Sequence, residues 1–183
     1  MEFCASPEWR ELVEEMVLPA ALGEHDLGDA VIEVGPGPGF TTDVLRNGAR
    51  RVVAVEIDPG LAGQLGERLT GSNVDVVHGD GTALCFPGRR FSGAGSFNML
   101  HHVPTAEAQD LIFGELARVL VPGGLLVAAD AVPHDGIDAF HEGDTYNPIE
   151  PDELPERMTA AGFTDVEVGS YELGWTCAAR APA

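Results

Sequence analysis

Lysine is absent from this chain: all ten basic residues are arginines, and they are outnumbered by 30 aspartates and glutamates. The formal net charge is therefore −20. Such a charge repels phosphate backbones and anionic lipid, so we expect no nucleic acid and no membrane among the partners. Small molecules and basic proteins stay open as partners.

Long apolar runs are also missing, since no stretch approaches the ~18 consecutive apolar residues of a membrane helix. Five glutamates within the first 15 residues are unlike a secretion signal. The cysteines are odd in number and lack metal-ligand spacing, so we expect reduced thiols, no metal site and a cytoplasmic location. They are Cys4, Cys85 and Cys177.

The most informative segment runs from residue 31 to residue 42. An apolar run is followed by glycines at positions 35, 37 and 39 and then by residues suited to a helix. This order predicts a buried parallel strand, a tight turn and a helix start. Glycines let a backbone approach a ligand closely, and a helix N-terminus presents unpaired N–H groups, so we expect a nucleotide-like cofactor here.

The spacing of these glycines distinguishes between cofactors. A dinucleotide site with the pattern G-x-G-x-x-G would need glycine at position 40, where this chain has Phe40. Gly35, Gly37 and Gly39 instead form G-x-G-x-G, and Glu33 stands two positions before them. This segment resembles the first motif of class I S-adenosylmethionine-dependent methyltransferases, E/D-x-G-x-G-x-G. The alternative is an ordinary turn rich in glycine and proline.

A second acidic residue follows at the distance expected for ribose binding. Residues 51–58 form a near-continuous apolar run, typical of a strand covered on both faces. Glu56 lies near its end, 19 residues after Gly37, where a carboxylate can accept both hydroxyls of a ribose. The alternative is a solvated acid at a strand end. Asp58 is expected to cap a helix over 60–69.

Two further strands lead to candidate cofactor contacts. The third, 74–78, is followed by Asp80 and Gly81, which resemble the methyltransferase loop that binds adenine; the alternative for Asp80 is a turn acid. The fourth strand, 93–100, contains Asn98 towards its end, where the transferable methyl group is expected.

Two histidines follow the fourth strand. The segment Leu100-His101-His102-Val103 matches a common methyltransferase pattern. We favour a structural role over catalysis for both histidines, because imidazoles near strand ends often hydrogen-bond to backbone groups.

Helix signals surround these strands. Apolar residues recur at helical spacing over 7–22, with Ser6 as N-cap and Pro19 as the end or a bend. Asn47-Gly48 is expected to end the helix after the glycine turn in the left-handed conformation. Thr105 is the expected N-cap of a helix that runs to residue 120.

The carboxyl-terminal half adds a second match. Residues 116–124 resemble the family's L-x-R-V-L-x-P-G-G turn, which leads into a fifth strand over 125–130. A helix over 151–161 follows, and then two strands that fit an antiparallel pair, 165–171 and 174–179.

Together these features resemble a small class I methyltransferase over residues 28–183. The resemblance implies an α/β fold: a Rossmann-like, doubly wound, seven-stranded sheet, mostly parallel with an antiparallel C-terminal strand, and helices on both faces. We expect one domain, 1–183. Its parts would be an N-terminal helix that covers the sheet or acts as a lid (1–27), a cofactor-binding core (28–131), a substrate-side loop (132–150) and a C-terminal helix and strand pair (151–183).

The resemblance also implies the cofactor, S-adenosylmethionine, with S-adenosylhomocysteine as the product. Glu33 and the backbone of Gly35, Gly37 and Gly39 would surround its methionyl part. The remaining expected contacts are Glu56 at the ribose with Ile57 beside it, Asp80 and Gly81 at the adenine, and Asn98 near the methyl group.

The substrate side is expected in residues 132–150, which leave the carboxyl end of the fifth strand. His141 is the best candidate for a general base, oriented by Asp144, with His134 in reserve; Tyr146 could hydrogen-bond the acceptor. The alternative is an ordered surface loop whose histidines bond locally. No recognisable metal-ligand spacing is present.

We therefore expect a methyltransferase, a monomer or homodimer, that acts on an oxygen or nitrogen of a small molecule. One alternative is a non-methylating cofactor-binding module or enzyme on the same fold, because fold does not imply function. A weaker alternative is a nicotinamide oxidoreductase, which Phe40 and the antiparallel strand pair oppose. Protein methylation stays open if the partner is basic.

Overall fold

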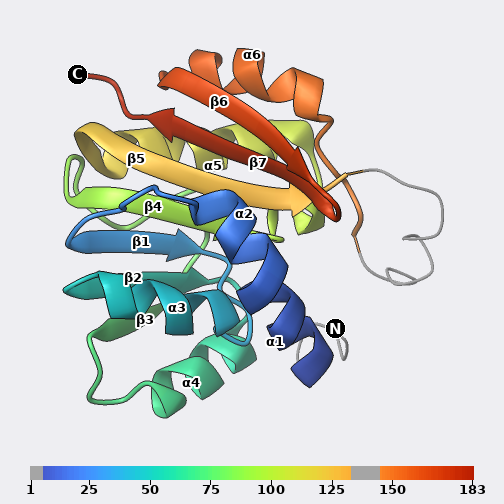
Figure 1. Ribbon diagram of the computed structural model, residues 1–183. Coiled ribbons are helices and arrows are strands. Elements are labelled where there is room, and N and C mark those ends of the chain that lie inside the picture. The colour runs from blue at the N-terminus through green and yellow to red at the C-terminus, as the bar shows by residue number, and fades with distance from the viewer. Residues whose placement is uncertain (1–5, 133–144) are drawn as a thin grey trace.

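The computed structural model describes residues 6–132 and 145–183, which contain one seven-stranded sheet (Figure 1). Its strands are β1 (Ala30–Val34), β2 (Arg51–Glu56), β3 (Val74–His78), β4 (Phe91–Phe97), β5 (Leu120–Ala131), β6 (Thr164–Tyr171) and β7 (Gly174–Arg180). They lie in the order β3-β2-β1-β4-β5-β7-β6. The first five run parallel, and β7 is antiparallel to both of its neighbours. The predicted fold class is confirmed.

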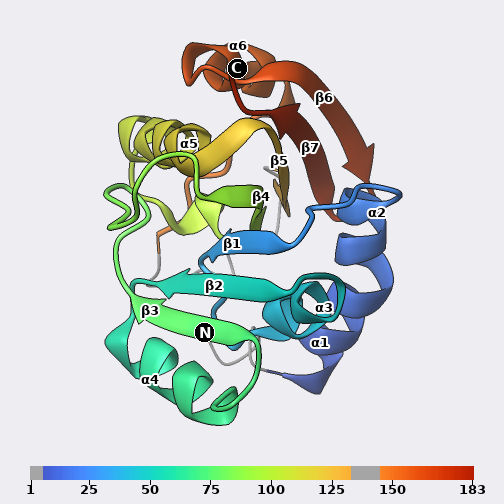
Figure 2. The same ribbon diagram turned by 90° about the vertical axis from the view of Figure 1, so that its left-hand side faces the viewer.

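Helices cover both faces of the sheet (Figure 2). They are α1 (Pro7–Leu12), α2 (Leu18–Leu22), α3 (Phe40–Gly48), α4 (Pro59–Arg68), α5 (Ala106–Val119) and α6 (Leu154–Ala160). The first three lie on one face and α5 and α6 on the other, while α4 packs against β2 and β3. Within the part of the chain that the structure describes, no helix is both long and apolar enough to cross a membrane.

Alternate residues of the central strands supply two hydrophobic cores. Ile32 and Val53 point to the α5 side, where they join Ile112. Val31 and Val52 point to the opposite side with the helices α1–α3. Because both faces are covered, these strands read as continuous apolar runs in the sequence.

The N-terminal helical segment packs as a cover over one sheet face. Ser6 caps it as predicted, since its Oγ accepts the N–H of Trp9 at 3.1 Å. Val13 and Val17, both within a π-helical turn, are buried against the sheet. The helix does not end at Pro19: the π turn Val13–Val17 comes just before this proline, which has no N–H to donate, and α-helix continues from Leu18 to Leu22.

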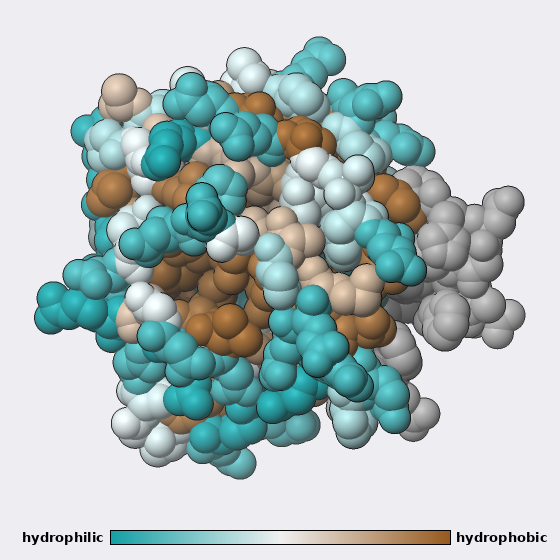
Figure 3. Space-filling model, in the orientation of Figure 1, coloured by the Kyte–Doolittle hydropathy of each residue, from teal (hydrophilic) through white to brown (hydrophobic). Residues whose placement is uncertain are grey.

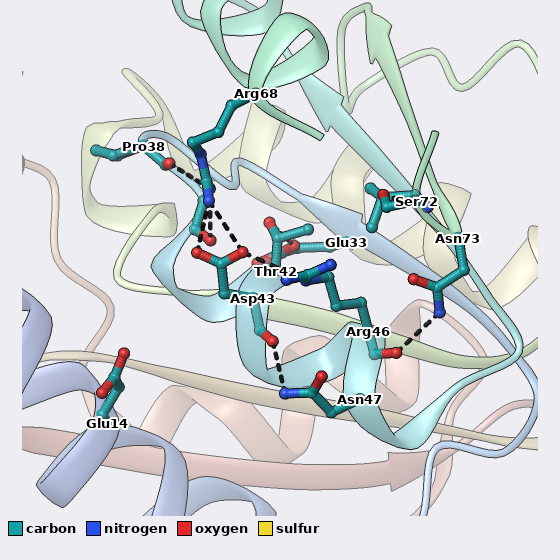
Figure 4. Close-up of polar contacts among 12 residues, drawn as sticks. Glu14, Glu33, Pro38, Thr42, Asp43, Arg46, Asn47, Arg68, Ser72 and Asn73 are labelled. Atoms are coloured by element: carbon teal, nitrogen blue, oxygen red, sulfur yellow. Dashed lines mark hydrogen bonds and ion pairs between the residues drawn. The ribbon is translucent and has the colours of Figure 1, made fainter. Parts of the chain in front are cut away.

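The predicted left-handed end of α3 is wrong. Gly48 belongs to the helix without a positive φ, and Ala49 follows in an extended conformation. A distant side chain takes the place of the local cap: Asn73, just before β3, donates its amide to the carbonyls of Arg46 at 2.8 Å and Ala49 at 2.9 Å (Figure 4).

Two strand boundaries differ from the prediction by three residues or more. β4 ends at Phe97 because Asn98 has a positive φ of 49° and residues 100–102 form a 3-10 turn. β5 begins at Leu120, before the predicted Pro-Gly-Gly turn, and its register with β4 shifts there, between the pairs Phe91–Leu120 and Gly93–Leu125.

Replacing Asn73 with alanine should destabilise the fold. Two hydrogen bonds to helix-terminal carbonyls are lost, so we expect the free energy of unfolding to fall by ~1–2 kcal/mol in urea denaturation. Asn47→Ala is the matched control, because the Asn47 amide bonds only the carbonyl of Asp43 within the same helix and is exposed. An equal loss in both variants would contradict a long-range cap.

Candidate functional site

The expected cofactor residues gather at one edge of the sheet. Gly35 follows β1, Ile57 follows β2 and Asn98 follows β4, so all three leave carboxyl ends of parallel strands. The strand order reverses between β1 and β4, which lie side by side. In open α/β sheets, ligands bind in the crevice at such a switch point.

The three loop glycines meet different surroundings, although all have positive φ, of 73°, 53° and 87°. A Cβ at Gly35 would collide with Met99, and one at Gly39 with Leu65 and Arg68. A Cβ on Gly37 would meet no described atom within 4 Å. The middle glycine therefore faces open space, as a cradle for a ligand requires.

Glu56 fastens this loop from the side of β2. Its Oε2 accepts the N–H of Gly37 at 2.9 Å and its Oε1 accepts the N–H of Asp58 at 3.0 Å. The residue is only 5% exposed. Asp58 caps α4 as predicted, by accepting the N–H of Leu61 at 2.8 Å. A carboxylate offers about four acceptor positions, so further donors can bind Glu56.

Glu33 lies beneath the loop and is almost completely buried, with 1% exposure. Its two oxygens accept the hydroxyls of Thr41 and Thr42 in the first turn of α3. Burial raises the pKa of Glu33 from 4.5 to about 7, against the opposing effect of the threonine hydroxyls. Glu33 thus ties β1 to α3 across the glycine loop.

The expected adenine side is more open. The side chain of Ile57 is 65% exposed. Asp80 accepts the N–H and the hydroxyl of Thr82, both at 2.8 Å, which is the turn contact considered as its alternative role. Gly81 is buried, and a Cβ there would come within 2.7 Å of Val34 Cγ1.

Two polar groups at the end of β4 are buried and have no hydrogen-bond partner among the described residues: the hydroxyl of Ser96 and the side-chain amide nitrogen of Asn98. Buried polar groups are normally paired, so these two mark a place where a polar ligand is accommodated. Together with the open side of Gly37, these groups form a site that fits a nucleotide-like cofactor.

A buried imidazole–carboxylate pair lies beside them, and the sequence interpretation did not foresee it. His101 Nδ1 bonds Oδ1 of Asp130, and the backbone N–H of His101 donates to Oδ2 at 3.1 Å. The exposed fractions are 6% and 1%. The available signal was Asp130 itself, an acid that ends a strand otherwise apolar from Leu125.

Aromatic side chains border this pair. The ring of His102 lies 4.1 Å from that of His101 between centroids, and Tyr146 lies 5.8 Å away edge-on. The hydroxyl of Tyr146 donates to the carbonyl of Val132 at 3.3 Å. The hydroxyl of Tyr171 is buried and bonds none of the described residues, and burial together with the charge of Asp130 raises its pKa to about 12.

The predicted catalytic residues His134, His141 and Asp144 lie outside the described residues. Tyr146, expected to contact the acceptor, is described and adjoins His101. Among residues 6–132 and 145–183, no group of three or more metal-ligating side chains is placed to hold a metal ion.

A family model described as "Methyltransferase domain" matches residues 32–128, more than half of the chain. The chain belongs to this family of methyltransferase domains. The resemblance read from the glycine loop is thereby confirmed, and with it the enzyme class and the S-adenosylmethionine cofactor.

Individual relatives match shorter parts. A protein of Thermococcus onnurineus (strain NA1) named "Probable ribosomal RNA small subunit methyltransferase A" is 38% identical over 77 residues, 42% of this chain and 27% of that protein. An "Uncharacterized methyltransferase" of Mycobacterium avium (strain 104) is 31% identical over 113 residues, 62% of this chain and 44% of that protein. The chain thus spans less than half the length of these relatives.

Solved structures are similar over the whole chain. A DhpI–SAH complex has a TM-score of 0.76 at 22% identity, covering 100% of this methyltransferase domain and 90% of that chain. A chain from a complex of the Haloferax volcanii Trm112 methyltransferase activator has a TM-score of 0.73 at 16% identity, covering 100% and 97%. At these identities the likeness shows the fold.

Replacing Gly37 with alanine should weaken binding of S-adenosylhomocysteine by ~10-fold or more in calorimetric titration, because a methyl group enters the open side of the loop. Gly71→Ala is the matched control: Gly71 also has a positive φ, of 80°, and open space at its Cβ. Both variants carry similar backbone strain. Equal affinities in the two would contradict the cradle.

Stability should report the protonation of Glu33. The folded state holds its proton up to about pH 7, whereas the ordinary value is 4.5. The neutral carboxyl therefore stabilises the fold fully below pH 4.5, and this contribution is lost as pH rises through about 7. Glu33→Gln stays neutral at every pH. The difference in unfolding free energy between this variant and wild type should therefore shift by ~3 kcal/mol in favour of the variant between pH 4.5 and about pH 7, as measured in urea titrations. A pH-independent difference would contradict the shifted pKa.

Proposed function

We propose that this methyltransferase domain transfers a methyl group from S-adenosylmethionine to an oxygen or nitrogen atom of a small molecule. The observation that carries the proposal is the buried His101–Asp130 pair, which lies near the end of β4, where the Asn98 side-chain nitrogen has no partner in the part of the chain that the structure describes. A proton acceptor at this position serves acceptors whose O–H or N–H must lose a proton.

The residues at the glycine loop and the neighbouring strand ends bind the cofactor. The bound cofactor supplies an electrophilic methyl group on a sulfonium. Gly37 leaves room for the methionyl part, and the carboxylate of Glu56 accepts the ribose hydroxyls in addition to its two backbone N–H groups. Ile57 covers one face of the adenine with its exposed side chain, and Asp80 with Gly81 borders its edge. Glu33 acts from beneath, by fixing the loop.

On the acceptor side, Asp130 fixes the imidazole of His101. Held in this way, the imidazole takes up the proton of the methyl acceptor. Both groups are almost completely buried, which strengthens the hydrogen bond between them. Alignment of the acceptor with the methyl group contributes the larger share of the rate, as in other displacement reactions.

The segment 132–150 belongs to the substrate side in this proposal. We retain it as the substrate side, with His141, oriented by Asp144, and His134 as further candidate bases. In the N-terminal segment, the described residues 6–27 cover the sheet with their helices and contact the start of α3, where the guanidinium carbon of Arg10 lies 4.6 Å from the ring centroid of Phe40.

The charge of the chain supports a small acceptor over RNA. Figure 3 shows hydrophilic side chains over the N-terminal helical segment, in which Glu8 and Glu11 of α1 and Glu14 and Glu15 of the following π-helical turn are exposed. With a net charge of −20, this surface repels phosphates. RNA methylation is the second candidate, because several relatives are named ribosomal RNA methyltransferases; however, the match covers only 24–29% of the length of those relatives.

Transfer of a radioactive methyl group separates these candidates. The protein is incubated with labelled S-adenosylmethionine and either a panel of phenols, carboxylic acids and amines or folded ribosomal RNA. We expect label in the small-molecule fraction. His101→Asn should lower that turnover by ~10²-fold or more and leave S-adenosylhomocysteine affinity within about twofold. Label in RNA, or in neither fraction, would contradict the proposal.

A further inference from the structure

Three of the ten arginines converge on one carboxylate beside the glycine loop. Asp43, in the first turns of α3, lies 3.3 Å from Arg10, 3.4 Å from Arg46 and 2.7 Å from Arg68. Its side chain is only 16% exposed. Because the chain has only ten basic side chains, the clustering of three of them around one carboxylate needs a physical explanation.

Arg68 differs from the other two because it also bonds the loop itself (Figure 4). Its Nη1 donates to both oxygens of Asp43, at 3.0 and 2.7 Å. Its Nη2 donates to the carbonyls of Pro38 at 3.0 Å and Gly39 at 3.2 Å. One planar guanidinium thus joins α4, the glycine loop and α3 in a fixed geometry.

The third glycine is what allows this approach. A Cβ at Gly39 would lie 2.6 Å from the Nη2 of Arg68. The positive charge of Arg68 next to the N-terminus of α3 is unfavourable towards the helix dipole, and the carboxylate of Asp43 offsets it. Gly39, Asp43 and Arg68 therefore form one unit, which we name the arginine clamp.

The arginine clamp and Glu56 hold opposite sides of the loop. Glu56 accepts the N–H of Gly37, while Arg68 donates to the carbonyls of the two residues that follow. Between these contacts the loop is closed by a bond from the N–H of Gly39 to the carbonyl of Pro36 at 2.9 Å. The peptide groups around Gly37 are thereby oriented before any ligand arrives, which lowers the ordering cost of binding.

We infer that Arg68 is a positioning residue for cofactor binding, which acts by fixing the carbonyls of Pro38 and Gly39 and with them the open side of Gly37. An exposed ion pair alone would contribute little to stability, and Arg68 is 40% exposed. The effect of the clamp is therefore expected in cofactor affinity rather than in the stability of the whole fold.

Three variants separate the geometry of the clamp from its charge. Arg68→Gln removes the guanidinium. Arg68→Lys keeps the charge but cannot bond the carboxylate and both carbonyls in one plane. Arg46→Gln removes another partner of Asp43, one whose side chain bonds none of the described loop residues. In calorimetric titration with S-adenosylhomocysteine we expect both Arg68 variants to bind roughly fivefold to tenfold more weakly, and Arg46→Gln to stay within about twofold of wild type.

Hydrogen exchange of the Gly39 and Phe40 amides in the free protein is the second measurement. Exchange should accelerate in both Arg68 variants and stay unchanged in Arg46→Gln, with equal melting temperatures. Wild-type affinity and exchange in Arg68→Gln, or full recovery of both in Arg68→Lys, would overturn the inference. It rests on the cofactor assignment, which the wild-type titration tests separately; if wild type fails to bind, the exchange result alone decides the clamp.

Discussion

The buried carboxylate of Glu33 is the contact on which the cofactor loop depends. It joins the end of β1 to the first turn of α3, so both ends of the glycine loop between them are held in place. From this base, Glu56 holds the loop on one side and Arg68 on the other. Three ionisable side chains, those of Glu33, Glu56 and Arg68, thus shape a loop that consists largely of glycine and proline.

Much of the fold follows from local sequence patterns. Continuous apolar runs identified the central strands, because both faces of the sheet are covered, and Ser6, Asp58 and Thr105 were recognised as helix caps from their own positions. The end of α3 was missed because its carbonyls are satisfied by Asn73, 27 residues from Arg46. A contact of that kind leaves no trace in a local pattern.

The site shows the same division. Glycine spacing and strand-end acids predicted the residues that meet at one sheet edge. They did not predict that Gly35 makes room for Met99 and Gly39 for Arg68, while Gly37 alone leaves space for a ligand. The His101–Asp130 pair joins residues 29 positions apart on neighbouring strand ends, so spacing could not reveal it. Each partner alone suggests only a local hydrogen bond.

The reversal of β7 has a practical consequence for handling the protein. Because this strand is antiparallel to β5, its last residues lie beside Leu125, at the edge of the sheet opposite the glycine loop. A fluorescent label or solid support joined after Ala183 therefore leaves the cofactor crevice accessible. The same attachment before α1 would stand closer to the glycine loop, because Arg10 of α1 lies over Phe40, the residue that follows Gly39.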